Sequence, residues 1–220
     1  SLDSTGYRTK SILSSKYEEV DVDEVARQQK HLSQRQQQDL AAMLKKHTKL
    51  FNGKLGLYTG RKVHLELEPN AKPISSRPYG VPKMHQTLFK EELDRLEKEG
   101  VLSRTGASEW LSPTFIVPKK DGRVRWVSDF RALNKVIKRK VYNLPRIQDI
   151  LSRRTGYQYF SKIDISMQYY TFELDESSKE LCTICTPFGN YRYNRLPMGV
   201  KQSPDVAQEI MEDILRGLEE

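Results

Sequence analysis

Asp164 is the side chain whose type and setting first suggest chemistry. It lies in YFSKIDISMQYYTFEL (159–174) between Ile163 and Ile165, where the pattern predicts the end of a β-strand. A carboxylate among β-branched residues is costly to bury without a partner. Asp164 therefore either forms a cap or turn, or serves as a ligand for a hard cation. Such a cation prefers carboxylate oxygens together with water and substrate phosphates.

Few acidic residues are placed to assist Asp164. Glu173 and Asp175 follow it in sequence, but they belong to the next strand or to its polar end. Asp129 is expected to bond within its own hairpin. A single aspartate is too little to hold a hard cation, so its partners must be found elsewhere.

A second stretch, PKKDGRVRWVSDFRALN (118–134), concentrates positive charge. Its Asp-Gly pair is typical of a tight hairpin turn. Guanidinium and ammonium groups suit a triphosphate or a nucleic-acid backbone, although a solvated hairpin tip explains the same charges. The cations are Lys119, Lys120, Arg123, Arg125 and Arg131.

A third stretch, RLPMGVKQSPDVAQEIM (195–211), contains a turn before a helix. Pro197 and Gly199 bracket the turn, and Ser203 begins the helix. The turn can bring backbone N–H groups and Met198 against a flat ligand. An ordinary connection between a strand and a helix explains the same residues.

Composition limits the classes of function. The 220 residues include 37 Lys and Arg against 29 Asp and Glu, which gives a net charge of +8. Such an excess favours a nucleic-acid partner, or serves only for solvation. No apolar run is long enough for a membrane span. The two cysteines form CTIC in a predicted strand, where positions three apart face opposite sides, and no second pair completes a zinc site.

The elements that position these residues follow from periodicity and turn signals. A polar arm over 1–32 precedes a capping box at Ser33 and Gln36, which predicts a helix over about 34–49. The remaining pattern predicts a half-buried strand in 61–68, a helix over 82–100, a hairpin over 114–130, a basic loop over 131–145, a short helix over 145–156, strands over 157–165, 171–174 and 181–197, and a last helix from 203.

The order of the motifs is more specific than any one of them. The sequence resembles the reverse transcriptase of gypsy-type LTR retrotransposons, and more distantly the retroviral enzymes, over roughly 38–220. The resemblance is carried by EKEGVLSRTGASEWLSPTFIVPKKDGRVRWVSDFRALN, YNLPRIQDIL, YFSKIDISMQYY and YNRLPMGVKQSPDVAQ. It implies an α+β fold: the fingers and an incomplete palm of a right-hand polymerase, with a split βαβ, ferredoxin-like sheet.

The resemblance implies a division of the chain. It assigns an arm after the protease region (1–32), a helix and strand leading into the polymerase (33–78), the first part of the fingers (79–138), the first part of the palm (139–171), the second part of the fingers (172–202) and a palm helix (203–220).

The resemblance also implies roles for single residues. Asp164 corresponds to the first of three catalytic aspartates, and the main chain of Ile165 to a further ligand of Mg²⁺ or Mn²⁺. The residues implied to contact the incoming dNTP are Lys119, Arg125, Tyr169 and Met198, of which Tyr169 excludes a ribose 2′-OH. Arg131 and Asn134 belong to a motif that supports the template and the fingers.

The sequence departs from the family pattern at Gln168, Met198 and Pro118, which leaves nucleotide selectivity open. The family's second and third aspartates lie in a Tyr-X-Asp-Asp turn after the last helix, and this chain ends at Glu220, before such a turn. We therefore expect the chain to be inactive in isolation.

The resemblance implies partners and a setting as well. The partners are an RNA or DNA template-primer, dNTP, and the protease, RNase H and integrase domains of a Pol polyprotein, with no membrane. The implied setting is intracellular, in the cytoplasm or a virus-like particle. The alternatives are a non-catalytic nucleic-acid-binding relic and a structural piece of a polyprotein.

Overall fold

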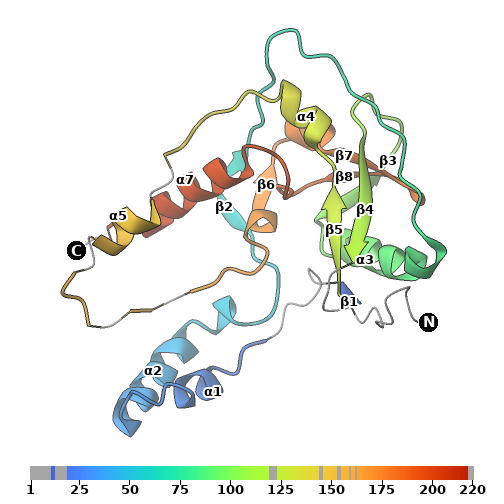
Figure 1. Ribbon diagram of the computed structural model, residues 1–220. Coiled ribbons are helices and arrows are strands. Elements are labelled where there is room, and N and C mark those ends of the chain that lie inside the picture. Colours follow the sequence, from blue (N-terminus) through green and yellow to red (C-terminus); the bar gives the residue numbers. More distant parts are fainter. Residues whose placement is uncertain are drawn as a thin grey trace. The chain divides into compact units, whose positions relative to one another are not determined.

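The computed structural model describes residues 11–12, 19–118, 123–143, 146–152, 155–158, 160–161 and 163–217 (Figure 1). Only the backbone is described for residues 11, 12, 118, 123, 124, 147, 150 and 151. The chain forms two compact units, one within residues 15–56 and the other from the rest. No helix among the described residues is long and apolar enough to cross a bilayer.

The unit within residues 15–56 is a pair of helices. Helix α1 spans Val22–Arg27, and the Asp21 side chain caps it by accepting from two backbone N–H groups. Helix α2 spans Gln34–Lys46 and is followed by the 3-10 turn η1 at Thr48–Leu50. The capping box of Ser33 and Gln36 is present, as predicted. The sequence did not predict α1, because its single turn and a half shows too little periodicity.

A six-stranded sheet is the centre of the other unit. Its order is β1-β5-β4-β7-β8-β3, with antiparallel β4–β5, β7–β8 and β3–β8 pairs and parallel β1–β5 and β4–β7 pairs. The strands are β1 (Ser11–Ile12), β3 (Leu102–Thr105), β4 (Ser112–Pro118), β5 (Arg123–Ser128), β7 (Thr183–Thr186) and β8 (Gly189–Tyr193). The predicted hairpin over 114–130 is thus confirmed as β4 and β5.

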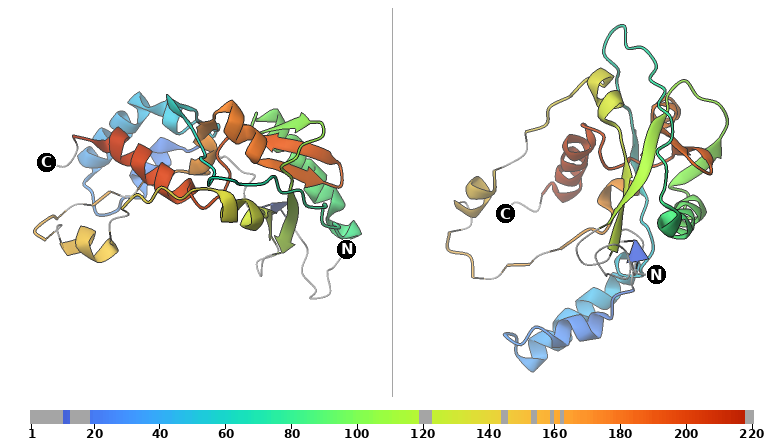
Figure 2. Two further views of the ribbon diagram at one scale, coloured as in Figure 1. Left: turned by 90° about the horizontal axis from the view of Figure 1, so that it is seen from above. Right: turned by 45° about the vertical axis from the view of Figure 1, so that its right-hand side comes forward.

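Helix α3 (Gln86–Lys98) buries its apolar face against this sheet, after the 3-10 turn η2 (Lys83–His85). Phe89, Leu93 and Leu96 are fully buried, and the Phe89 ring lies 4.6 Å from that of Trp126 on β5. Figure 2 shows α3 running beside the strands. Burial of such side chains is worth about 1.5–3 kcal/mol each, so this layer is the main core.

A second, two-stranded sheet pairs β2 (Tyr58–Val63) with β6 (Phe172–Leu174) in parallel. The strand predicted over 61–68 therefore begins and ends earlier than expected. The backbone N–H of Leu65 donates to the Ser178 hydroxyl at 2.8 Å, which removes it from the ladder. The opposite edge of β6 bonds to the residues after β8, because the N–H of Leu196 donates to the Phe172 carbonyl.

The other helices are short except for the last. They are α4 (Arg131–Val136), α5 (Ile147–Ser152), η3 (Gln168–Thr171), α6 (Glu176–Leu181) and α7 (Ser203–Leu215). The start of the predicted basic loop over 131–145 is wrong, because α4 occupies it. The Phe130 carbonyl accepts from Asn134 N–H, and Leu133 turns one side of this helix into the core.

The strand predicted over 157–165 is also wrong. The described residues of this segment form no strand and pair with no other described strand. The side chains of Phe160 and Ile163 are 69% and 85% exposed. A strand needs a neighbour for its backbone groups, and the described sheets offer none beside this segment. The described residues between α4 and η3 lie outside both sheets (Figures 1 and 2).

A buried hydrogen-bond network joins three strands inside the main sheet. The Tyr193 hydroxyl on β8 accepts from the Trp126 indole N–H at 3.1 Å and shares a bond of 2.8 Å with the Ser128 hydroxyl. Ser128 in turn bonds Thr114 on β4 at 2.9 Å. Burial of Tyr193 raises the pKa of its hydroxyl, so it stays neutral.

Replacing Tyr193 by Phe should destabilise the protein by about 1–3 kcal/mol, because it removes the acceptor of the buried Trp126 indole N–H and one of the two bonds of the Ser128 hydroxyl. Urea unfolding followed by tryptophan fluorescence measures the loss. Tyr191→Phe, on the same strand, is the control, since the Tyr191 hydroxyl takes no part in this network. Equal stabilities of the two variants would contradict the prediction.

Asp175 should make stability depend on pH. Burial alone would raise its pKa, but hydrogen bonds from Ser178, His64 and Ser177 lower it to about 2. Because the folded pKa lies below the unfolded value, this contribution is present above about pH 4 and is lost as the pH falls toward 2. Asp175→Asn should flatten the dependence of unfolding free energy on pH between 5 and 2.5. An unchanged slope would argue against this role.

Candidate functional site

Asp164 lies on the exposed segment before η3. Its side chain is exposed, and it makes no ion pair or hydrogen bond with another residue of the described ranges. Ile165 beside it is 41% exposed. Three residues on, Met167 has a left-handed backbone with φ of 51° and begins the turn into η3. The carboxylate is therefore presented to solvent just before the chain returns to the protein body.

The described residues alone do not make a divalent-cation site. A carboxylate such as that of Asp164 is a donor that hard cations prefer, but they take several oxygen ligands. Within the described ranges no group of three His, Cys, Asp or Glu side chains lies close enough to hold a metal ion.

The β4–β5 hairpin carries part of the predicted cation cluster on its described residues. Arg125 lies on β5 opposite Val117 and its side chain is exposed. Lys119 and Lys120 lie outside the described residues, and only the backbone of Arg123 is described. The predicted cation cluster is therefore tested at Arg125 and Arg131 alone.

Arg131 forms a two-point ion pair with Asp129. Its Nε and Nη2 atoms donate to the two carboxylate oxygens at 2.9 and 2.7 Å, and its backbone N–H donates at 3.1 Å. The guanidinium lowers the pKa of Asp129, and the Tyr79 hydroxyl donates to the same carboxylate at 3.3 Å. The pair fixes the guanidinium, which is still 84% exposed and can meet an anion.

A groove of about 370 Å³ lies beside this ion pair. Tyr79 and Phe115 form its aromatic part, with ring centres 5.5 Å apart in an edge-to-face contact. The rest of its lining comes from Gly80, Val81, Pro82, Ile116 and Arg131. The exposed Tyr79 and the half-buried Phe115 next to a fixed guanidinium offer aromatic surface of the kind on which nucleic-acid bases stack.

Tyr169 and Met198 are connected through β6. Tyr169 lies in η3, directly before β6, and partial burial raises its pKa. Met198 is half-buried in the turn between β8 and α7. The start of that turn bonds to β6, because Leu196 N–H donates to the Phe172 carbonyl at 2.9 Å. The structure thus links two of the residues predicted to contact a nucleotide.

Asn134 reaches the same turn from α4. Its side-chain amide N–H donates to the Gly199 carbonyl at 2.7 Å, and its oxygen accepts from Lys201 N–H at 2.8 Å. Of the predicted residues, the structure therefore brings Asn134, Met198 and Tyr169 to one framework. It shows no contact of these three with Asp164 among the described residues.

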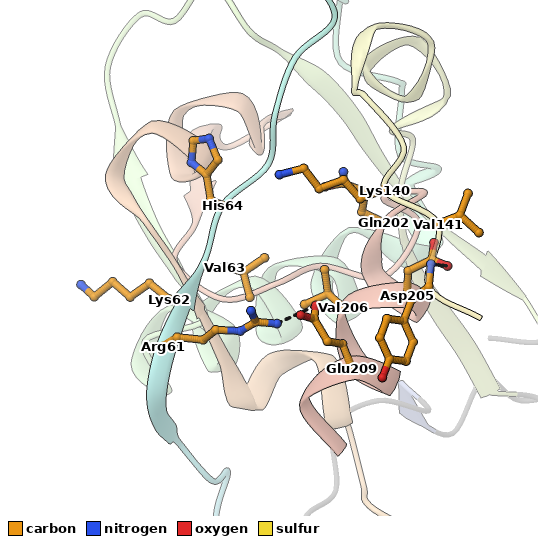
Figure 3. A pocket seen from close by; sticks show the side chains of 11 residues that line it. Arg61, Lys62, Val63, His64, Lys140, Val141, Gln202, Asp205, Val206 and Glu209 are labelled. Atoms are coloured by element: carbon orange, nitrogen blue, oxygen red, sulfur yellow. Dashed lines mark hydrogen bonds and ion pairs between the residues drawn. The ribbon is translucent and has the colours of Figure 1, made fainter. Parts of the chain in front are cut away.

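A polar cavity of about 360 Å³ lies between β2, residues 140–142 and the start of α7 (Figure 3). Arg61 of β2 and Glu209 of α7 form an ion pair of 2.6 Å across it. The buried Asp205 accepts from Tyr142 N–H at 3.2 Å, and the Gln202 amide donates to the Lys138 carbonyl. The bonds of Asp205 and Gln202 hold residues 138–142, which follow α4, against the start of α7.

The sequence did not predict the groove of Tyr79 and Phe115 or the contacts of residues 138–142 with the start of α7. Tyr79 lies in a Pro-rich stretch without periodicity, and Phe115 was indistinguishable from a core residue of an alternating strand. Asp205 looked like an ordinary acidic residue in a first helical turn. A buried acid there has no signal in a single sequence.

Comparison with known proteins gives a family. Residues 117–220, which contain the hairpin, Asp164 and the Met198 turn, match the family "Reverse transcriptase (RNA-dependent DNA polymerase)". The uncharacterized protein K02A2.6 of Caenorhabditis elegans is 35% identical over 81% of the chain. The retrovirus-related Pol polyprotein from transposon 297 of Drosophila melanogaster is 30% identical over 86%. The chain spans only 14% and 18% of the lengths of these two relatives.

A solved structure shares the fold. The foamy viral protease-reverse transcriptase dRH in complex with double-stranded DNA superposes with a TM-score of 0.81 at 22% identity, over 97% of this chain and 38% of that one. The predicted α+β polymerase fold is thereby confirmed. Over residues 117–220 the chain matches the reverse transcriptase family, and over most of its length it is similar to a retrovirus-related Pol polyprotein of a transposon.

Proposed function

We propose that the chain provides the fingers and the first part of the palm of an RNA-directed DNA polymerase, whose reaction is template-directed nucleotidyl transfer. The observation that carries this proposal is the family match over 117–220, a range that contains the basic hairpin, Asp164 and the Met198 turn in order. A single shared motif would support it far less.

Asp164 is proposed as a catalytic ligand of Mg²⁺ or Mn²⁺, with the main chain of Ile165 as a second ligand. In polymerases, paired divalent cations stabilise the charge on the attacking and leaving oxygens. The solvent exposure of the Asp164 carboxylate supports this role, since it leaves the oxygens free for a cation. The further carboxylates that such a site needs are not among the described residues near it.

The proposed nucleotide contacts are Lys119 and Arg125 on the fingers and Tyr169 and Met198 on the palm side. The exposure of Arg125 supports a grip on the triphosphate, because a free guanidinium pairs well with phosphate oxygens. The connection of η3 with the Met198 turn through β6 supports a shared surface for the sugar and base.

The template is proposed to pass over the groove of Tyr79 and Phe115. The fixed guanidinium of Arg131 beside these rings supports the idea, since it offers a cation to the backbone while bases stack. The solved relative bound to double-stranded DNA supports a nucleic-acid partner of this general kind.

The narrower assignment is a gypsy-type LTR retrotransposon, supported by the similarity to the polyprotein of transposon 297. It carries with it protease, RNase H and integrase as neighbouring domains and an intracellular place of action, in the cytoplasm or a virus-like particle. A nucleic-acid-binding relic without catalysis is the second candidate. The lack of a metal-holding group among the described residues favours testing it.

Removing two fingers cations should weaken binding. The double variant Lys119→Ala/Arg125→Ala should bind template-primer about tenfold more weakly at low salt, with a salt slope smaller by about 1 for each lost phosphate contact. Fluorescence anisotropy over a salt series measures both. The control, Arg27→Ala/Lys45→Ala, removes two exposed cations from the other unit. Equal losses in both variants would indicate a general charge effect and favour a structural role.

The 220-residue chain should bind a primed template but not extend it. The reason is that one carboxylate cannot hold two hard cations, and the described residues add no metal-holding group. Gel analysis of a labelled primer with Mg²⁺ and dNTPs checks this. Asp164→Asn should leave template-primer affinity unchanged. Primer extension by the unmodified chain would refute the expectation. A loss of template-primer binding by the Asp164→Asn variant would refute it as well.

A further inference from the structure

We infer that Asn134 is a positioning residue for the nucleotide site: its side-chain amide holds the turn at 197–201 and thereby sets the place of Met198. The inference rests on the proposed function, in which Met198 lies beside the incoming nucleotide. It differs from the expected role of Asn134 as a support of the template. Helix α4, which carries Asn134, lies beside the chain that enters α7 (Figure 1).

The Asn134 side chain bonds the turn as a neighbouring strand would, through one donor and one acceptor. Asn134 donates to the Gly199 carbonyl at 2.7 Å and accepts from Lys201 N–H at 2.8 Å, so it brackets Val200. Val200 is buried, with 2% of its surface exposed. Because these two bonds reach backbone groups two residues apart, they fix the direction of the backbone between Gly199 and Lys201. A single hydrogen bond would leave the backbone free to rotate about it.

Among the described residues, other bonds hold Leu196, Pro197 and the Val200 carbonyl, which accepts from Ser203 N–H at 3.0 Å. At its start, Leu196 N–H donates to Phe172, and at its end the Ser203 hydroxyl donates to the Pro197 carbonyl at 2.8 Å. Gly199 has φ of 94°, where any other residue is strained, and a Cβ there would lie 3.5 Å from the Ser128 carbonyl. Among the described residues, Asn134 is the hydrogen-bond partner of the two remaining groups, the Gly199 carbonyl and the Lys201 N–H.

Asn134 is itself fixed to the core. Its N–H donates to the Phe130 carbonyl at 2.7 Å, and the neighbouring Leu133 is 2% exposed. The amide is half-buried and its two bonding groups both point to the turn. A side chain used in this way acts on the nucleotide through Met198 rather than by touching the template.

The test compares Asn134→Ala, which removes both bonds, with Asn134→Asp, which keeps the acceptor for Lys201 N–H. Asn194→Ala is the matched control. Its amide also makes two bonds, at 3.2 Å each, to the Gly100 carbonyl and the Ser103 hydroxyl. The first readout is amide hydrogen exchange of residues 197–202 in the 220-residue chain. Asn134→Ala should speed exchange of the Lys201 amide about tenfold, the equivalent of one lost hydrogen bond. Asn134→Asp should leave that amide slow.

The second readout separates nucleotide from template. The protein is first bound to a template-primer whose primer ends in a dideoxynucleotide. Titration of this complex with the complementary dNTP gives the dNTP affinity. Dilution of the same complex, in a separate experiment, gives the template-primer affinity. Asn134→Ala should weaken dNTP binding roughly tenfold and change template-primer affinity by less than about twofold. In a Met198→Ala background the effect of Asn134→Ala on dNTP should disappear, because both act through one contact.

The outcomes separate the inference from the function beneath it. Unchanged exchange at 197–202, or equal losses of dNTP and template-primer affinity, would overturn the inference. If the unmodified chain binds template-primer but shows no dependence on complementary dNTP, the proposed nucleotide role of Met198 fails, and the inference fails with it even where exchange confirms the two bonds.

Discussion

The buried hydroxyl of Tyr193 is the interaction on which the arrangement of the larger unit depends. It receives the indole N–H of Trp126 and bonds Ser128, and so ties β8 to β5 at the depth where Phe89 of α3 also packs. Apolar contacts alone allow strands to slide in register, whereas a satisfied polar group in the core specifies one pairing. The fingers hairpin and the strand that leads to α7 are thereby held to each other.

The candidate site inherits its geometry from that pairing. After Tyr193 the chain runs along β6, turns at Met198 and enters α7, while β5 continues through Phe130 into α4. The two continuations meet where Asn134 contacts Gly199 and Lys201. Residues far apart in sequence thus form one rigid frame beside η3. Asp164 lies outside this frame, on a segment fastened near Tyr142 and again at η3.

Local chemistry explains which elements could be predicted. The Asp-Gly turn with alternating apolar residues indicated the β4–β5 hairpin, and Ser33 with Gln36 indicated the start of α2, because both signals act over a few residues. The segment 157–165 has the alternation of a strand, but its described residues pair with no described strand, and pairing is not a local property. The Tyr79–Phe115 groove and the bonds of Asn134 join residues 36 or more positions apart, so they carried no signal in one sequence. The predicted roles of Asp164, Arg125 and Met198 came from ordered motifs, and the structure adds their surroundings.

The exposed side chains of Phe160 and Ile163 have a practical consequence. Exposed apolar side chains close together in sequence are places where another molecule can attach. These two side chains should therefore favour association between molecules as the protein concentration rises. A charged residue in place of Ile163 should improve colloidal behaviour without touching the core, since that side chain is 85% exposed.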